Sequence, residues 1–481
     1  MRKVPLQFQI ASTLLNCCFG SGLLSIPIVA QRIGLFWFVL YNLTAVIFSC
    51  FVFHQIINEH TRNKCTQPTL TTMISAKFGR FWTFLIDLSI IFCLLPVSYI
   101  AVSAGNIGQA ISTWANLPQL TENSWQIGLK FICGLLVMFP LSLLKTIKVL
   151  NFISSFCILF VFLTVLYVIG QFFSWLATGR ILNRDHVAPI LQVWPANDNY
   201  ILTFTFITMF LSLYSMTASI PCIMREYVQD FNITVPEMKL RMRQAVFYIT
   251  IPVAFCIYTG FGILSLFFFD FTCVRDASGN QVDPGCFQIN SNVILAFAGD
   301  QTATVIMLLF SIVVFVSFPC MLYPIRRSII QFFKIDADLA TFKGYLKYNI
   351  IGFSVTIVCI VITSFLSAID EIQSFTSNLL GMFLYGMSGL MIWYKQGIVL
   401  DIPDSINNSV EESPEINYEE NQLQAANENG SKDELLQIET AKVQQQPLPI
   451  LRTAIFSVFS FVLIGLNVLA MSCQLYSLIR P

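Results

Sequence analysis

Long apolar stretches, separated by short polar segments, run along almost the whole chain. A helix of about 20 apolar residues is long enough to cross the hydrocarbon core of a bilayer. On that scale the apolar windows predict eleven membrane spans, at residues 8–30, 34–57, 82–108, 125–144, 149–176, 201–224, 244–269, 303–324, 346–366, 371–394 and 451–473. The pattern therefore predicts an all-α, multi-pass integral membrane protein.

The composition excludes most soluble functions. Apolar residues make up 56% of the 481 residues and charged residues only 11%, whereas a soluble domain carries about 25% charged residues. There is no phosphate-binding loop, and the three histidines are not spaced with cysteines or carboxylates for metal binding. We therefore expect no catalytic residues, no cofactor and no nucleic-acid partner. The protein is expected to be a monomer in the lipid bilayer and not an enzyme.

The basic residues predict how the spans are oriented. Placing the N-terminus in the cytosol puts 21 of the 27 Lys and Arg residues on the cytosolic side and 6 on the outer side, in agreement with the positive-inside rule. With eleven spans the C-terminus is then extracellular or lumenal. The sequence does not decide between the plasma membrane and a lysosomal or vacuolar membrane.

The cysteines agree with this orientation. Of the 14 cysteines, only Cys273 and Cys286 fall in an outer loop, on either side of a turn-rich stretch. The oxidising outer compartment favours a disulfide between them, which would stabilise the fold by about 3 kcal/mol in the chain-entropy model. The alternative is two unrelated thiols.

Residues 401–449 differ from the rest of the chain. They carry 11 acidic residues against Lys432 and Lys442, together with many Asn and Gln residues. Such a composition cannot bury a core and predicts disorder. This acidic cytosolic linker divides the chain into a ten-span core (1–400) and a region with the eleventh transmembrane helix (450–481).

Ten spans followed by an extra one suggest two repeats of five, at about 8–176 and 201–394. Because five is odd, the second repeat must cross the membrane in the opposite sense to the first. Long loops occupy equivalent places in the two repeats, 58–81 and 270–302, and each ends in a short amphipathic stretch, Leu70–Phe78 and Val293–Ala298. In proteins built from such inverted repeats, the first helix of each repeat is broken near the bilayer midplane, and the substrate binds there.

Span one carries a clear signal of a break. Gly20-Ser21-Gly22 lies at mid-span and Pro27 follows, and both glycine and proline weaken a helix interior. Exposed N–H groups at a break can hold a carboxylate, and glycine lets a ligand approach the backbone closely. The alternative interpretation is a close contact between helices of the small-residue type.

Span six lacks glycine but gathers five hydroxyl groups within eight residues. They either bond back to carbonyls of their own helix or, because span six is the counterpart of span one, line the binding site. The candidate substrate-binding residues are therefore Gly20, Ser21, Gly22, Ser212, Tyr214, Ser215 and Thr217.

Three motifs carry a resemblance to a known family. They are Asn16, Gly20-Ser21-Gly22, Leu24 and Pro27 in span one, Pro221, Ile223 and Glu226 at the end of span six, and Phe318–Arg327 (FPCMLYPIRR) at the end of span eight. They resemble the amino acid/auxin permease family, nearest its sodium-coupled neutral amino acid transporter branch, although the sixth-span motif has one extra residue. The resemblance implies a LeuT-type fold of the amino acid-polyamine-organocation class, with a five-plus-five inverted repeat and an eleventh helix. It also implies alternating access, with the substrate amino and carboxyl groups held by the backbone near Gly20 to Gly22.

The resemblance further implies an ion site. In the sodium-coupled branch, the asparagine that matches Asn16 binds the ion together with a hydroxyl two or four residues before the proline of span eight. Ser317 matches the first of these positions, so Asn16 and Ser317 are candidate sodium ligands. The other position is Phe315, which cannot coordinate an ion, and sodium and proton coupling therefore both stay open.

These observations predict a secondary active amino acid transporter that works as a symporter. Spans one, six, eight and ten carry no charged residue at mid-span, and burying an unpaired charge is strongly disfavoured, so the substrate is expected to be a neutral amino acid. A channel would show a filter motif or rings of like residues, and none is visible. A transporter-like amino acid sensor in an internal membrane would keep the same site and stays an alternative.

Asp87 in span three has two interpretations. It is either an interfacial residue paired with Arg80 or another cytosolic base, or a buried proton carrier.

Overall fold

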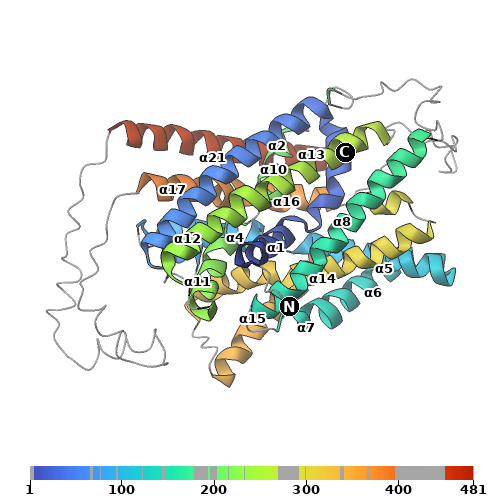
Figure 1. Ribbon diagram of the computed structural model, residues 1–481, viewed down its shortest axis with the longest axis horizontal. Coiled ribbons are helices and arrows are strands. Elements are labelled where there is room, and N and C mark those ends of the chain that lie inside the picture. The colour runs from blue at the N-terminus through green and yellow to red at the C-terminus, as the bar shows by residue number, and fades with distance from the viewer. Residues whose placement is uncertain are drawn as a thin grey trace. The chain divides into compact units, whose positions relative to one another are not determined.

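The computed structural model describes residues 5–65, 69–75, 77–93, 96–121, 123–143, 147–177, 193–195, 203–214, 216–231, 233–268, 292–297, 300–335, 341–365, 369–395 and 450–479. Within these ranges every regular element is a helix (Figure 1). The chain divides into two units, residues 1–392 with 459–481, and residues 393–458. In the second unit Tyr394 stacks on Phe456, with ring centroids 4.3 Å apart, and Arg452 lies over the ring of Trp393.

The first five predicted spans form the helices α1 to α8. Their bounds are α1 Leu6–Cys18, α2 Gly22–Arg62, α3 Leu70–Ser75, α4 Arg80–Cys93, α5 Val97–Ala115, η1 Pro118–Thr121, α6 Asn123–Phe131, η2 Ile132–Met138, α7 Phe139–Leu141 and α8 Ile147–Ala177. α2 has 41 residues, about 60 Å of helix, which is twice the thickness of the hydrocarbon core. It therefore holds the second half of predicted span one and all of span two.

Gly34 makes the turn between these two parts of α2. Its φ of 78° lies in the left-handed region that favours glycine. A Cβ here would lie 2.5 Å from the carbonyl oxygen of Trp194, so a side chain would also clash. The predicted boundary between spans one and two falls at this residue.

The remaining spans form the helices α10 to α21. Their bounds are α10 Ile207–Leu213, α11 Ser219–Phe231, α12 Val235–Arg243, η4 Gln244–Thr250, α13 Ile251–Phe268, η5 Val293–Phe297, α14 Gln301–Phe332, α15 Phe342–Phe365, α16 Ile369–Met382, η6 Phe383–Met387, α17 Ser388–Tyr394 and α21 Ile450–Ile479. The short helices α3 and η5 lie in the two equivalent amphipathic stretches, as the repeat predicts.

Prolines shape several of these spans. The wide π-helical turns η2 and η4 each end two residues before a proline, Pro140 and Pro252. Proline donates no backbone hydrogen bond and its ring presses on the carbonyl one turn earlier, and a widened turn relieves both problems. Pro96 precedes α5 and separates it from α4 within predicted span three.

Eight helices in the described ranges are long and apolar enough to cross a membrane, and a ninth is the bent pair Ile372–Asn378 and Phe383–Tyr394. The broken helices α1, α10 and α11 are too short to be among these, and the long α2 counts as one helix. Helices occupy all eleven predicted ranges, but the count of eleven spans and the inverted repeat stay predictions. Large apolar side chains such as Ile47, Leu136 and Phe461 are exposed, as expected of a surface that faces lipid.

The helices of the first unit pack in two groups. In one group α2 packs against α13, α10 and α12, and α1 packs against η4 and α12; in the other, α14 packs against α4, α5 and α15. α8 lies beside both α1 and α14 (Figure 1). The core between the groups contains the broken part of span one.

The predicted disulfide and the acidic linker lie outside the described residues. Cys273 and Cys286 fall between α13 and η5 in the sequence, and residues 401–449 precede α21. The disulfide, the disorder of the linker, and the division of the chain at residues 400 and 450 that depends on the linker stay predictions.

Candidate functional site

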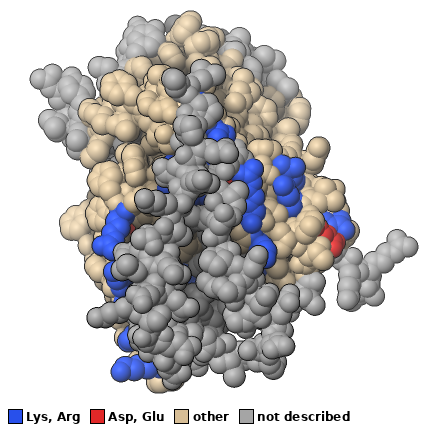
Figure 2. Space-filling view, turned by 90° about the vertical axis from the view of Figure 1, so that its left-hand side faces the viewer, with Lys and Arg blue, Asp and Glu red and all other residues tan. Residues whose placement is uncertain are grey.

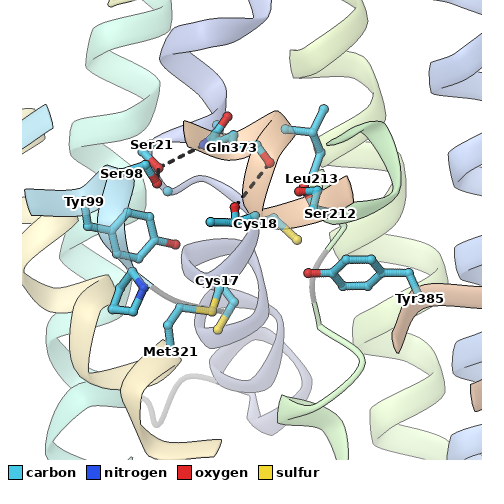
Figure 3. A pocket seen from close by; sticks show the side chains of 15 residues that line it. Cys17, Cys18, Ser21, Ser98, Tyr99, Ser212, Leu213, Met321, Gln373 and Tyr385 are labelled. Atoms are coloured by element: carbon cyan, nitrogen blue, oxygen red, sulfur yellow. Dashed lines mark hydrogen bonds between the residues drawn. The ribbon is translucent and has the colours of Figure 1, made fainter. Parts of the chain in front are cut away.

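A small cavity lies between the two groups of helices, at the breaks of spans one and six. Its volume is about 60 Å³. The cavity is lined by residues in or next to α1, α2, α5, α10, α14, α16 and η6. They are Cys17, Cys18, Gly20, Ser21, Gly22, Pro96, Ser98, Tyr99, Ser212, Leu213, Met321, Gln373, Thr376, Ser377 and Tyr385. In Figure 3, Tyr99 and Tyr385 enter from opposite sides with their hydroxyl groups toward the middle. Among the described residues, no charged side chain lines this cavity.

The break in span one leaves backbone N–H groups at the cavity. α1 ends at Cys18, where the N–H of Phe19 donates to the carbonyl of Leu15 at 2.7 Å. α2 begins at Gly22, and the N–H groups of Gly20 and Ser21 donate to no backbone carbonyl in the described part of the chain. Unpaired N–H groups beside a helix N-terminus suit a carboxylate.

Both glycines of the motif are held in close contacts. A Cβ on Gly20 would lie 2.2 Å from the hydroxyl oxygen of Tyr99. A Cβ on Gly22 would lie 2.8 Å from Cδ2 of Leu213 and 3.3 Å from Nε2 of Gln373. The side chains that approach the glycines also line the cavity. The close small-residue contact and the binding cavity therefore do not exclude each other.

Gln373 of α16 is a site residue that the sequence analysis missed. Its amide Nε2 donates to the hydroxyl of Ser21 at 3.0 Å, and its Oε1 accepts from the hydroxyl of Ser25 at 2.8 Å. The hydroxyls of Ser21 and Ser98 share a further hydrogen bond at 2.5 Å. Polar side chains from α5 and α16 thus surround the break in span one. Gln373 lies near the start of predicted span ten, where no motif marks it.

Span six is broken where the sequence analysis predicts. α10 ends at Leu213 and α11 begins at Ser219. Ser212 lines the cavity, whereas the hydroxyl of Tyr214 donates to Oδ1 of Asn42 on α2 at 2.8 Å, and Thr217 is buried away from the lining. Ser215 lies outside the described residues. Of the span-six candidates described, the structure brings only Ser212 to the cavity.

Tyr258 of α13 joins the two breaks. Its hydroxyl oxygen lies 2.6 Å from the carbonyl oxygen of Cys18 and 3.2 Å from that of Leu213. These are the last residues of α1 and α10, whose carbonyls have lost their helical partners. The ring packs edge-on against Phe19 and Tyr214, with centroids 5.6 Å away in each case. One buried hydroxyl therefore fixes the ends of both broken helices.

We expect Tyr258→Phe to reduce transport about tenfold or more while the protein still folds. The phenylalanine ring keeps the packing, but the buried carbonyls lose their donor, which costs about 1–3 kcal/mol, and about 1.4 kcal/mol corresponds to a factor of ten. Initial uptake rates and thermal melting of the purified protein measure the effect.

The matched control for Tyr258→Phe is Tyr167→Phe. The Tyr167 hydroxyl donates to the carboxylate of Asp300 at 2.6 Å, away from the cavity, and this bond holds the pKa of Asp300 below its usual value. Equal uptake losses in the two variants would contradict a special role of Tyr258.

The candidate ion ligands Asn16 and Ser317 lie together. The hydroxyl oxygen of Ser317 is 3.2 Å from both the backbone carbonyl oxygen and Oδ1 of Asn16, and 2.8 Å from the carbonyl oxygen of Val313. Nδ2 of Asn16 donates to the hydroxyl of Ser154 on α8 at 3.4 Å. Neutral oxygens from α1 and α14 therefore lie together, Ser154 of α8 contacts the amide nitrogen of Asn16, and all three side chains are fully buried. Such oxygens suit a hard monovalent cation, and Ser154 is a further ligand candidate that no motif marked.

Asp87 is not paired with Arg80. It is 2% exposed, and its carboxylate accepts a hydrogen bond from the hydroxyl of Thr71 on α3 at 2.7 Å. In the described residues no basic side chain forms an ion pair with it. The partner that the structure gives Asp87 is therefore a hydroxyl and not Arg80, and pairing with another cytosolic base and a role in carrying protons both stay open.

Arg326 of the span-eight motif has a packing role. Arg326 is 1% exposed and donates to the carbonyl oxygen and the hydroxyl of Ser142, at 2.8 and 2.6 Å, and lies over the ring of Tyr348. A Cβ on Gly352 would lie 2.2 Å from the guanidinium group. Arg326 therefore joins α14 to the residues after α7 and to α15.

Comparison with known proteins decides the family. The family described as transmembrane amino acid transporter protein matches residues 7–267, more than half of the chain. The chain belongs to this family. The resemblance to the amino acid/auxin permeases is thereby confirmed, and the chain is a membrane protein that transports amino acids and not an enzyme. None of the curated proteins matches it significantly.

Solved structures of transporters share its fold. The chain is similar to a mutant of the manganese transporter of Eremococcus coleocola, with 13% identity, 96% of this chain and 93% of that chain covered, and a TM-score of 0.50. It is also similar to Mhp1, a nucleobase-cation-symport-1 family transporter in a closed conformation, with 12% identity, 81% and 77% covered, and a TM-score of 0.50. At this identity the likeness shows the fold alone.

Proposed function

We propose that the protein is a secondary active transporter that moves neutral amino acids by alternating access, coupled to sodium or protons. The observation that carries this proposal is the cavity, which lies between two groups of helices and holds unpaired backbone N–H groups but no charged side chain among its described lining residues. The zwitterionic backbone of an amino acid would use the N–H groups and hydroxyls, and an uncharged side chain needs no countercharge.

The cavity size favours small substrates. A cavity needs about 10–15 Å³ to hold one water molecule. The 60 Å³ of this cavity therefore hold about four to six water-sized groups. This matches the backbone of an amino acid with a small side chain. Movement of the α1–α2 group relative to the α5–α14 group would open the cavity to one side or the other.

We also propose that the N-terminus is cytosolic and that the ends of α2, α11 and α14 face the cytosol. Figure 2 shows Lys and Arg side chains spread over the described part of the face where α12 lies, with few acidic ones. In this region the buried Glu59 carboxylate lies 2.6 Å from Nζ of Lys77. The excess of basic residues supports a cytosolic position.

Uptake into proteoliposomes tests the proposed function. We expect alanine, serine and glycine to compete most strongly with a labelled neutral amino acid, and lysine and glutamate to compete weakly. Uptake is measured with an imposed sodium gradient, with an imposed proton gradient and with neither. Preference for lysine or glutamate over all neutral amino acids would contradict the substrate class. Saturable binding without uptake under any gradient would instead favour the sensor.

A further inference from the structure

A second, larger groove lies on the outside of the first unit, where the start of α1 meets the junction of α12 and η4. Its volume is about 540 Å³, nine times that of the central cavity. Gln7 and Phe8 of α1 form one wall, and the other is formed by Leu240, Arg243, Gln244, Tyr248 and Ile249. Transport as proposed does not use this groove.

The polar end of the groove carries positive charge that the described residues do not neutralise. Arg243 donates to Oδ1 of Asn58 at 3.0 Å, and its Nε has no hydrogen-bond partner in the described residues. Lys239 lies close enough to Arg243 to feel its charge. Glu237 is 3.5 Å from Arg241 rather than from Arg243. Among the described side chains, no carboxylate therefore forms an ion pair with Arg243.

The other end of the groove is apolar and open. Phe8 is 51%, Leu240 55% and Tyr248 79% exposed. Exposed apolar groups of this size are unfavourable against water, and the basic groups at the other end of the groove attract an anion. The groove suits a ligand that is anionic at one end and apolar at the other.

The two ends of the groove are expected to lie at different depths of the membrane, because their residues lie at different positions along the span. The span Val235–Leu266 has 32 residues, about 48 Å of helix, whereas the hydrocarbon core is about 30 Å thick. The predicted span seven begins at residue 244, so Lys239 and Arg243 precede it and are expected at the level of the lipid headgroups. Tyr248 follows more than one turn deeper, at the level of the acyl chains.

We infer that this groove binds an anionic phospholipid of the cytosolic leaflet. The phosphate lies on Arg243, which can offer paired N–H donors to its oxygens, and an acyl chain covers Phe8, Leu240 and Tyr248. Anionic lipids are concentrated in the cytosolic leaflet and attract basic groups near the membrane. The inference rests on the proposed cytosolic orientation but not on transport. The bound lipid would hold the start of α1 against α12, in addition to the 2.9 Å hydrogen bond from Arg241 to Gln7.

Native mass spectrometry of the full-length protein in nanodiscs tests this site. The nanodiscs contain phosphatidylcholine with a minority of phosphatidylserine. We expect retained phosphatidylserine in the wild type and a loss of about tenfold in Arg243→Gln. Lys343→Gln, which removes an exposed charge from the start of α15 away from the groove, is expected to retain the lipid like the wild type. Tyr248→Ser, which keeps the charge but removes the apolar wall, is expected to lose it in part.

Three results would overturn the inference. They are retention of phosphatidylcholine and phosphatidylserine in equal amounts, equal loss in Arg243→Gln and Lys343→Gln, and full competition by inorganic phosphate, which would indicate an anion site without a lipid. The melting temperature in pure phosphatidylcholine checks that Arg243→Gln is folded. Lipid retention is measured without an amino acid substrate. A failed uptake assay would therefore leave the lipid result unaffected, and a failed lipid assay would leave the proposed transport function unaffected.

Discussion

Gly22→Val should abolish uptake while the protein still reaches the membrane. The new Cβ alone would lie 2.8 Å from Leu213 and 3.3 Å from Gln373, and the two methyl groups would extend further into a cavity of only about 60 Å³. An overpacked site forces neighbouring side chains and backbone to shift, and here those neighbours belong to the break of span six and to α16. Initial uptake rates, normalised to the amount of protein at the membrane, measure the effect. We expect a loss of at least about a hundredfold, since overpacking costs about 1–3 kcal/mol and the substrate also loses its space.

The matched control is Gly260→Val on α13. A Cβ at Gly260 meets no atom within 4 Å, so this variant introduces the same side chain into a membrane span without a clash. It should transport like the wild type. Gly22→Ala should fall between the two, because the Leu213 methyl group can turn away from a single Cβ. Wild-type uptake by Gly22→Val would show that the Gly20 to Gly22 stretch is only a packing contact.

The broken helices could be predicted because their causes are local. Gly20 and Gly22 weaken span one wherever it is placed, and the structure ends α1 at Cys18 and begins α2 at Gly22. Span six has no glycine, yet its break between Leu213 and Ser219 was predicted from its place as the counterpart of span one.

The other walls of the cavity could not be predicted, because they depend on contacts between distant parts of the chain. Gln373 meets Ser21 across 352 positions of sequence, and neither hydropathy nor spacing in span ten distinguishes it from other polar residues. The side chain of Tyr214 was assigned to the site from its type and position alone. Its hydroxyl instead donates to Asn42, because an amide acceptor on α2 lies within reach.

Asp87 is a charged residue whose contacts could likewise not be predicted from the sequence. Its place a turn or so inside span three favoured an interfacial ion pair, but the fold brings α3 and its Thr71 hydroxyl against the carboxylate. The position along a span does not reveal which side chain a neighbouring short helix places beside it. The candidate ion ligands could be predicted in part. The motifs identified Asn16 and Ser317, whereas Ser154 is a candidate only because α8 packs beside Asn16.

Asn16→Ala should raise the cation concentration for half-maximal uptake by about tenfold or more and leave the order of amino acid preference unchanged. The change removes one of the side-chain oxygens around Ser317, and hydrogen-bond or ligand contacts to a charged group contribute about 1.5–3 kcal/mol, where about 1.4 kcal/mol is tenfold. Because we propose that the amino acid itself binds at the unwound backbone beyond Cys18, its selectivity should change little. Uptake as a function of sodium concentration, at fixed pH and fixed substrate, measures the shift.

Ser317→Ala should act in the same direction, and Ser311→Ala is its matched control. Ser311 lies on the same helix, is equally buried and donates to the carbonyl oxygen of Met307, so its loss removes a hydroxyl from α14 away from Asn16. Because Asn16 and Ser317 share one cluster, the double variant should lose less than the sum of the two single losses. Wild-type uptake that needs no sodium, or a sodium dependence unchanged in both variants, would show that the cluster only joins α1, α14 and α8. Coupling would then have to be sought at another buried group, and Asp87, with its Thr71 partner, would be the first to replace by asparagine in assays with a proton gradient.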